Sequence, residues 1–134
     1  MIINQVSVFL ENKPGQLLEF TNLMAENNIN ILALALSEAP DYGLLRVIVD
    51  EYEAVEAIAK EKGYLCTVTP VVAVDVPNEP GSLVKILDIL AKNNINVAYS
   101  YISFIDKNGS DGIILRVDDT EGAEKLLKEA GIVA

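Results

Sequence analysis

Residues 12–31 read NKPGQLLEFTNLMAENNINI, and residues 78–97 read NEPGSLVKILDILAKNNINV. At this offset of 66 residues, nine of the 20 positions are identical, whereas chance matching at ordinary residue frequencies gives roughly one or two. Residues 50–63 resemble residues 118–131 at an offset of 68, and the two additional residues fall in the polar stretch 106–110. The chain is therefore an internal duplication.

Both copies predict the same order of elements. An apolar, β-branched run (6–10 and 71–76) predicts a strand, and Pro-Gly then precedes a helix with apolar residues at helical spacing. A second strand (29–37 and 95–105), a third strand (44–49 and 113–117) and a second helix follow. The fourth strand covers 64–69 in the first copy. In the second copy only 132–134 remain, so this strand is either truncated or completed by another segment, for which residues 1–4 are the candidate.

The order βαββαβ, present twice, predicts the α+β class and two ferredoxin-like modules at 1–69 and 70–134, each an antiparallel sheet with both helices on one face. The stretch Leu32-Ala33-Leu34-Ala35-Leu36 is apolar in both alternate phases. One phase should face the helices, and the other needs another cover. We expect a sheet-to-sheet or edge-to-edge contact, between the modules or between two chains. Exposed leucines at 32, 34 and 36 would be costly, so this segment favours a homo-oligomer, in the simplest case a dimer, over a monomer.

Composition argues against two classes of partner. The net charge is −10, with 20 acidic and 10 basic residues, whereas nucleic-acid binding depends on clustered Lys and Arg. No apolar run approaches the roughly 18 residues that span a bilayer, and no basic amphipathic helix suits a membrane surface. Residues 1–6 do not resemble a signal peptide, so we expect a cytoplasmic location.

The side chains that most enzymes use are scarce. The chain has no histidine and a single cysteine, Cys66, which we interpret as a small core residue. Neither the dinucleotide-binding nor the P-loop glycine pattern occurs. The acidic pairs 50–51 and 118–119 precede helices and are interpreted as caps, and residues 106–111 as a turn rather than a calcium loop. We expect no enzymatic activity, no cofactor and no metal site.

The repeated motif Asn-x-Pro-Gly-x-Leu carries most of the chemical content. Proline fixes φ and glycine allows a sharp turn from strand into helix. The first amide groups of that helix have no intrahelical partner and carry partial positive charge, so they suit a carboxylate. Asparagine at the strand end can donate and accept hydrogen bonds. The alternative interpretation is a tight strand-to-helix turn with no ligand.

This set of motifs resembles the ACT domain family twice over: Asn-x-Pro-Gly-x-Leu before a helix, Asn-Asn-Ile-Asn after it, then Leu-Arg-Val, Asp and a helix that ends in Gly. The resemblance implies a regulatory module that binds amino acids or similar effectors where two modules meet, and strands that join side by side into an eight-stranded sheet. The ligand would then lie at the turn after the first strand and at the start of the second strand of a neighbouring module. The residues that the resemblance selects are Asn12, Pro14, Gly15, Gln16, Leu17, Asn30 and Ile31 in the first copy, and Asn78, Pro80, Gly81, Ser82, Leu83, Asn96 and Val97 in the second.

Such modules are usually fused to an enzyme, and no catalytic domain is recognisable in these 134 residues. The first hypothesis is therefore a stand-alone sensor of a free amino acid. The second is a regulatory subunit of an amino-acid biosynthetic enzyme, resembling the small subunit of acetolactate synthase. The third is an unrecognised enzyme. Gln16 against Ser82 predicts that the two copies differ in ligand affinity.

Overall fold

A computed structural model describes residues 1–103 and 110–132 of the chain. The chain divides into two compact units. The first unit comprises Asn4–Thr69, and the second unit comprises Pro70–Ala134 together with Met1–Ile3. Residues 1–3, which the repeat assigns to the first module, thus lie with the second unit.

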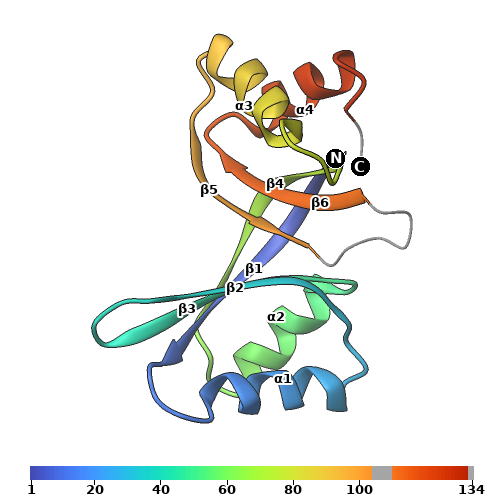
Figure 1. The fold of residues 1–134 in the computed structure, drawn as a ribbon. Helices are drawn as coiled ribbons and strands as arrows, with labels where there is room; N and C mark the ends of the chain where they lie inside the picture. Colours follow the sequence, from blue (N-terminus) through green and yellow to red (C-terminus); the bar gives the residue numbers. More distant parts are fainter. Residues whose placement is uncertain (104–109, 133–134) are drawn as a thin grey trace. The chain divides into compact units, whose positions relative to one another are not determined.

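The first unit follows the predicted order. Its elements are β1 (Ile2–Glu11), α1 (Gln16–Glu26), β2 (Ile31–Glu38), β3 (Tyr42–Val49), α2 (Tyr52–Glu61) and the beginning of β4 (Cys66–Pro77). The strands lie in the order β2-β3-β1-β4, with β3 antiparallel to both β1 and β2. Helices α1 and α2 cover one face of these strands (Figure 1).

A single core lies between the helices and the sheet of this unit. Alternate residues of β1 point into it, namely Val6, Val8 and Leu10, and α1 contributes Phe20 and Met24. This alternation is the period of two that places one face of a strand against a core. Cys66 packs half-buried against the same cluster, as expected, and burial raises the pKa of its thiol.

The second unit repeats this arrangement. Its elements are the end of β4, α3 (Ser82–Lys92), β5 (Val97–Ile102), β6 (Ser110–Val117) and α4 (Thr120–Glu129). The strand order is β5-β6-β4-β1, and β6 is antiparallel to β4 and β5. Helices α3 and α4 lie on one face of these strands (Figure 1), over a core that includes Val74, Ile86, Leu90 and Leu127. The ferredoxin-like module is thus present in both units.

The N-terminal residues complete the sheet of the second unit, as the sequence suggested. The Ala73 amide donates to the Met1 carbonyl over 2.8 Å. The Ile2 amide donates to Glu124 Oε2 of α4 over 2.7 Å. The beginning of β1 therefore takes the place in the second unit that the fourth strand of the repeat would hold.

The helix ends agree with the predictions. Asn28 and Asn94 follow α1 and α3 with φ of 56° and 57°, and Gly63 and Gly131 follow α2 and α4 with φ of 82° and 77°. These are left-handed conformations, which Asn and Gly tolerate better than other residues.

The predicted acidic caps are correct only in part. Asp119 Oδ1 accepts from the Gly122 amide over 2.9 Å, whereas Glu51 makes no side-chain cap bond to α2. Asp50 and Asp118 accept instead from the Asn30 and Asn96 amides, because these carboxylates lie beside the beginning of the second strand of each unit.

Several boundaries differ from the predictions. β1 begins at Ile2 rather than at Val6, and β2 and β5 begin two residues later than expected. The predicted fourth strand of the first copy and first strand of the second copy form one continuous strand, β4. The predicted strand end at 104–105, the turn at 106–109 and residues 133–134 lie outside the described residues. No helix in the described part of the chain is long and apolar enough to cross a membrane.

Leu34 and Leu36 of β2 lie on the helix-covered face of the sheet, and Leu32 lies at a register shift between Ile31 and Ala33. Leu34 and Leu36 are opposite Val47 and Leu45 of β3, which belong to the core of the first unit. The alanine phase, not the leucine phase, lies on the other face. All three leucines remain substantially exposed because β2 is the outer strand of its unit, so no neighbouring strand or second helix covers them.

Candidate functional site

The Pro-Gly motif of the first unit forms an open corner between β1 and α1. Gly15 precedes the helix in the left-handed region, with φ of 87° and ψ of −8°, and no side chain caps the helix. An added Cβ on Gly15 would meet no atom within 4 Å. The backbone at this corner is therefore open to a ligand.

The first amide groups of α1 are largely free. The Gln16 amide makes a long bond of 3.4 Å to the Lys13 carbonyl, and the first regular helical bond runs from the Glu19 amide to the Gly15 carbonyl over 2.9 Å. In the described part of the chain, the amides of Leu17 and Leu18 have no hydrogen-bond acceptor. Their partial positive charge suits an anionic group.

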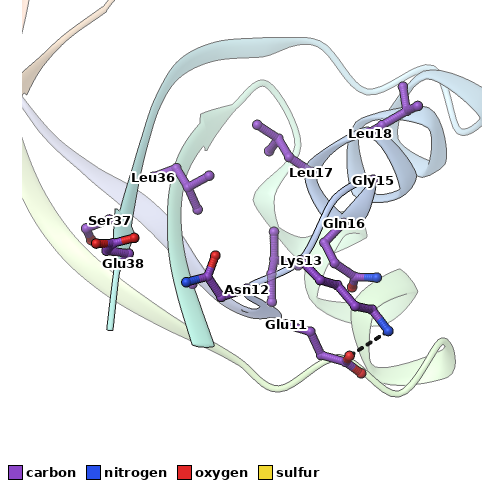
Figure 2. Close-up of a pocket in the computed structure, with 12 residues that line it drawn as sticks. Glu11, Asn12, Lys13, Gly15, Gln16, Leu17, Leu18, Leu36, Ser37 and Glu38 are labelled. Carbon is purple, nitrogen blue, oxygen red and sulfur yellow. Dashed lines mark ion pairs between the residues drawn. The ribbon is translucent and has the colours of Figure 1, made fainter. Parts of the chain in front are cut away.

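A pocket of about 430 Å³ lies beside this helix end. The corner and the beginning of α1 form one side, and the end of β2 forms the other (Figure 2). Leu17 and Leu36 face each other across it in Figure 2, and Asn12 extends toward the end of β2. The lining residues are Leu10, Glu11, Asn12, Lys13, Gly15, Gln16, Leu17, Leu18, Leu36, Ser37, Glu38 and Gly43.

The ionisable side chains around the pocket differ in whether they form an ion pair. Lys13 Nζ lies 2.7 Å from Glu11 Oε2, and this hydrogen bond raises the pKa of the lysine. These two side chains therefore neutralise each other. Glu38, at the end of β2, makes no such ion pair with another described residue, so the pocket has a carboxylate on one side and free amide groups on the other.

The structure brings together part of the predicted site in the first copy. Asn12, Gly15, Gln16 and Leu17 line the pocket, and Pro14 belongs to the same corner without lining it. The predicted residues 30–31 lie at the other end of β2. There the Asn30 amide donates to Asp50 Oδ1 over 3.1 Å, which ties the beginning of β2 to the end of β3.

The second copy has the same backbone corner but different side-chain contacts. Gly81 has φ of 90°, and the amides of Leu83 and Val84 likewise have no acceptor among the described residues. However, Ser82 is buried, and its hydroxyl donates to the Pro77 carbonyl over 2.7 Å. Gln16, its counterpart in the first copy, is only half-buried and lines the pocket.

A pocket of about 500 Å³ in the second unit includes Ser82 alone among the predicted residues. Its other lining residues come from β4, the side of α3 and the end of α4, for example Asp75, Lys85 and Gly131. The remaining predicted residues, Asn78, Pro80, Gly81, Leu83, Asn96 and Val97, do not line it. The Asn96 amide donates to Asp118 Oδ1 over 3.1 Å, which repeats the strand contact of the first copy.

The sequence interpretation missed the residues at the end of β2, namely Leu36, Ser37 and Glu38. A signal was available, because β1 and β2 flank the antiparallel β3 and therefore run parallel, so that both end at the same edge of the sheet. Reading the two strand ends together would have placed Glu38 and Asn12 at the same edge of the sheet, with β3 between them. No cluster of three or more metal-ligating side chains occurs among the described residues.

Comparisons with known proteins agree with this fold. A family model described as an ACT domain pair matches residues 1–133. A crystal structure of a protein from Bacteroides thetaiotaomicron is similar with a TM-score of 0.92 and 33% identity, over 99% of this chain and 91% of that one.

More distant structures show the fold alone. The ligand-free regulatory subunit of aspartate kinase from Thermus thermophilus has a TM-score of 0.67 and 16% identity, over 97% of each chain. The corresponding subunit from Thermus flavus has a TM-score of 0.61 and 14% identity, over 97% of this chain and 95% of that one. No curated protein matches the chain in sequence.

Proposed function

The chain belongs to the family of ACT domain pairs, and we propose that it is a non-catalytic regulatory sensor that binds a free amino acid. The observation that carries this proposal is the pocket beside Gly15, where free amides and a carboxylate lie on opposite sides. A free amino acid carries both complementary charges. Its carboxylate would bind the amides of Leu17 and Leu18, and its ammonium would bind Glu38 and Asn12.

The pocket also suggests which class of side chain is preferred. Its apolar lining comes from Leu17, Leu18 and Leu36, and its one lysine is already paired with Glu11. An acidic ligand side chain would find no free cation among the lining residues. We therefore infer that apolar or small polar amino acids bind better than acidic ones.

The open side of the pocket fits the implied pairing of modules. The leucines of β2 are exposed along the same edge. A second ACT module placed there would cover the leucines and the open side of the pocket. We infer that modules of two chains join edge to edge into an eight-stranded sheet, as a homodimer. The bound ligand would then shift this assembly, because it acts through a difference in affinity between two states.

Isothermal titration calorimetry against the twenty standard amino acids tests this proposal. We expect saturable binding of at least one apolar or small polar amino acid, and none of aspartate or glutamate. The absence of a heat signal for every amino acid at millimolar concentration would contradict the proposal. A sensor of a free amino acid is expected in the compartment where that amino acid is made. The proposal therefore includes a cytoplasmic location.

A second candidate is a regulatory subunit of an amino-acid biosynthetic enzyme. A chain of this fold and similar length is the regulatory subunit of aspartate kinase in Thermus thermophilus, and exposed apolar side chains at the outer strands could bind an enzyme chain. Size-exclusion chromatography of a native cell extract separates the candidates. Elution of the protein with a large enzyme favours the subunit, and elution at the size of a small oligomer favours the stand-alone sensor.

A further inference from the structure

Gly43 of β3 lines the pocket beside Gly15 and is itself buried. A glycine inside a strand weakens the strand, because it has no side chain to pack and loses more conformational freedom on folding than other residues. The backbone does not require glycine here. The φ of Gly43 is not positive, and its pairing with Leu10 on one side and Glu38 on the other is in regular register. The remaining reason for a glycine in a strand is the close approach of another group.

The side chain of Leu36 is the group that approaches Gly43. A Cβ added to Gly43 would lie 3.3 Å from Leu36 Cδ1, which is closer than the separation of about 3.5–4.0 Å at which carbon atoms pack best. Leu36 also lines the pocket and faces Leu17 across it (Figure 2). A side chain at position 43 would therefore displace Leu36 and narrow the space between Leu36 and Leu17.

The second copy has an aspartate at the position of Gly43. At the repeat offset of 68, Gly43 corresponds to Asp111. The strand pairing agrees, because Gly43 is opposite Leu10 and Asp111 is opposite Val76, the counterpart of Leu10. Both positions precede by two residues a strand residue that belongs to the core of its unit. The alternation of strand side chains therefore places both on the helix-covered face of the sheet.

An aspartate at this position disfavours an amino acid for two reasons. The half-buried side chain of Asp111 takes up room at a position that Gly43 leaves empty. Its carboxylate also has the same sign of charge as the carboxylate of the ligand, so the two repel each other. The second copy moreover has Phe104 in its sequence where the first copy has Glu38, at the offset of 66. The pocket of about 500 Å³ in the second unit does not include Asp111.

We propose that Gly43 restricts amino-acid binding to the first copy and sets the room for the bound side chain, so that each chain has one site. The inference deepens the proposed function and rests on it for the identity of the ligand. Gly43 acts through Leu36 and is therefore a positioning residue. The second copy, with Asp111 at the same place, keeps the fold of the module and binds no amino acid.

An exchange of the two residues tests which copy binds. The probe is the amino acid that the wild type binds best among the standard twenty, and calorimetry gives its dissociation constant and the number of sites per chain. We expect one site per chain in the wild type. Gly43→Asp, which gives the first copy the residue of the second, should show no measurable binding. Asp111→Gly is the matched control and should keep one site with the affinity of the wild type.

A pair of smaller changes tests whether Gly43 acts through Leu36. Gly43→Ala should raise the dissociation constant roughly tenfold, because one additional methyl group in a packed pocket costs about that factor. Leu36→Val removes the Cδ1 atom that the new methyl group would meet. In a chain that already carries Leu36→Val, Gly43→Ala should therefore raise the dissociation constant less than about threefold. An equal factor in both backgrounds would mean that Gly43 does not act through Leu36.

The outcomes separate this inference from the proposed function. Binding by Gly43→Asp with the affinity of the wild type, or two sites per chain in the wild type, would overturn the inference and leave amino-acid binding intact. A wild type that binds none of the twenty amino acids would overturn the proposed function and the inference with it. Circular dichroism establishes that each variant is folded. If Gly43→Asp does not fold, the milder Gly43→Ala and Leu36→Val variants decide the question.

Discussion

Gly15 and Gly81 occupy a backbone region that other L-residues rarely adopt. Their φ values are 87° and 90°, and an added Cβ at either position would meet nothing within 4 Å. Replacement by alanine thus tests backbone strain separately from crowding. We expect Gly15→Ala to lower the free energy of unfolding by about 1 kcal/mol, as measured by urea denaturation.

The control for this prediction is Gly15→Asn, since asparagine tolerates the left-handed region better than alanine. We expect its loss of stability to be smaller than that of Gly15→Ala. Equal stability of the alanine variant and the wild type would mean that the corner relaxes to another backbone conformation.

Glu38 is the residue on which the proposed recognition of the ligand ammonium depends. It is exposed, so removal of its charge should weaken binding only moderately. For the best-binding amino acid in calorimetry, we expect Glu38→Gln to raise the dissociation constant roughly threefold to tenfold, about 1 kcal/mol. Glu61→Gln, an exposed carboxylate at the end of α2, should leave binding unchanged. Equal affinity of Glu38→Gln and the wild type would remove Glu38 from the site.

At the scale of elements, one carboxylate of α4, that of Glu124, contributes to the attachment of the N-terminal strand beside its backbone bonds to Ala73. The Ile2 amide and, more weakly, the Lys128 ammonium lower the pKa of Glu124 below its ordinary value of 4.5. The folded state therefore favours the charged form. Its contribution to stability is complete well above pH 4.5 and is lost as the pH falls through the lowered pKa.

This contribution can be measured against a variant that cannot ionise. We expect the free energy of unfolding of Glu124→Gln to fall less steeply than that of the wild type as the pH is lowered from 5 to 3. The two proteins should differ most near neutral pH, where the wild type is more stable. Parallel pH profiles would show that the negative charge of Glu124 contributes no net stability. Urea denaturation at each pH provides both profiles.

The elements were predictable from sequence because local patterns determine them. Each of these patterns involves only a few neighbouring residues. They are the alternation in β1, the helical spacing around Phe20 and Met24, and the helix ends at Asn28 and Asn94. The attachment of Met1–Ile3 to the second unit was only suggested by a missing strand. The proposed role of Glu38 was not predicted, because its position at the same sheet edge as Asn12 arises through the register of β3, a relation between segments that are far apart in the sequence.

Ser82 shows why the repeated motif does not form the same pocket in both copies. The sequence offered the same motif twice, with Gln16 replaced by Ser82. Only the structure shows that the serine hydroxyl bonds the Pro77 carbonyl and is buried, whereas Gln16 lines the pocket. A short side chain at a helix start can satisfy local backbone groups, and a longer one extends into the neighbouring space.

At the scale of the whole molecule, the proposed edge-to-edge homodimer predicts a dependence on the exposed leucines of β2. Leu34 is 39% exposed on the outer strand of its unit, and it does not line the pocket. A charge buried there without a partner is costly, so we expect Leu34→Glu to raise the dimer dissociation constant roughly 30-fold or more.

The control separates the loss of this edge from the general effect of an added charge. Leu65→Glu changes a 75% exposed leucine outside β2 and should leave the dimer intact. By sedimentation equilibrium, we expect the wild type and Leu65→Glu to have twice the 14.5 kDa mass of one chain, and Leu34→Glu to have a lower average mass. A Leu34→Glu variant that is folded by circular dichroism and as dimeric as the wild type would show that β2 does not form the contact between chains.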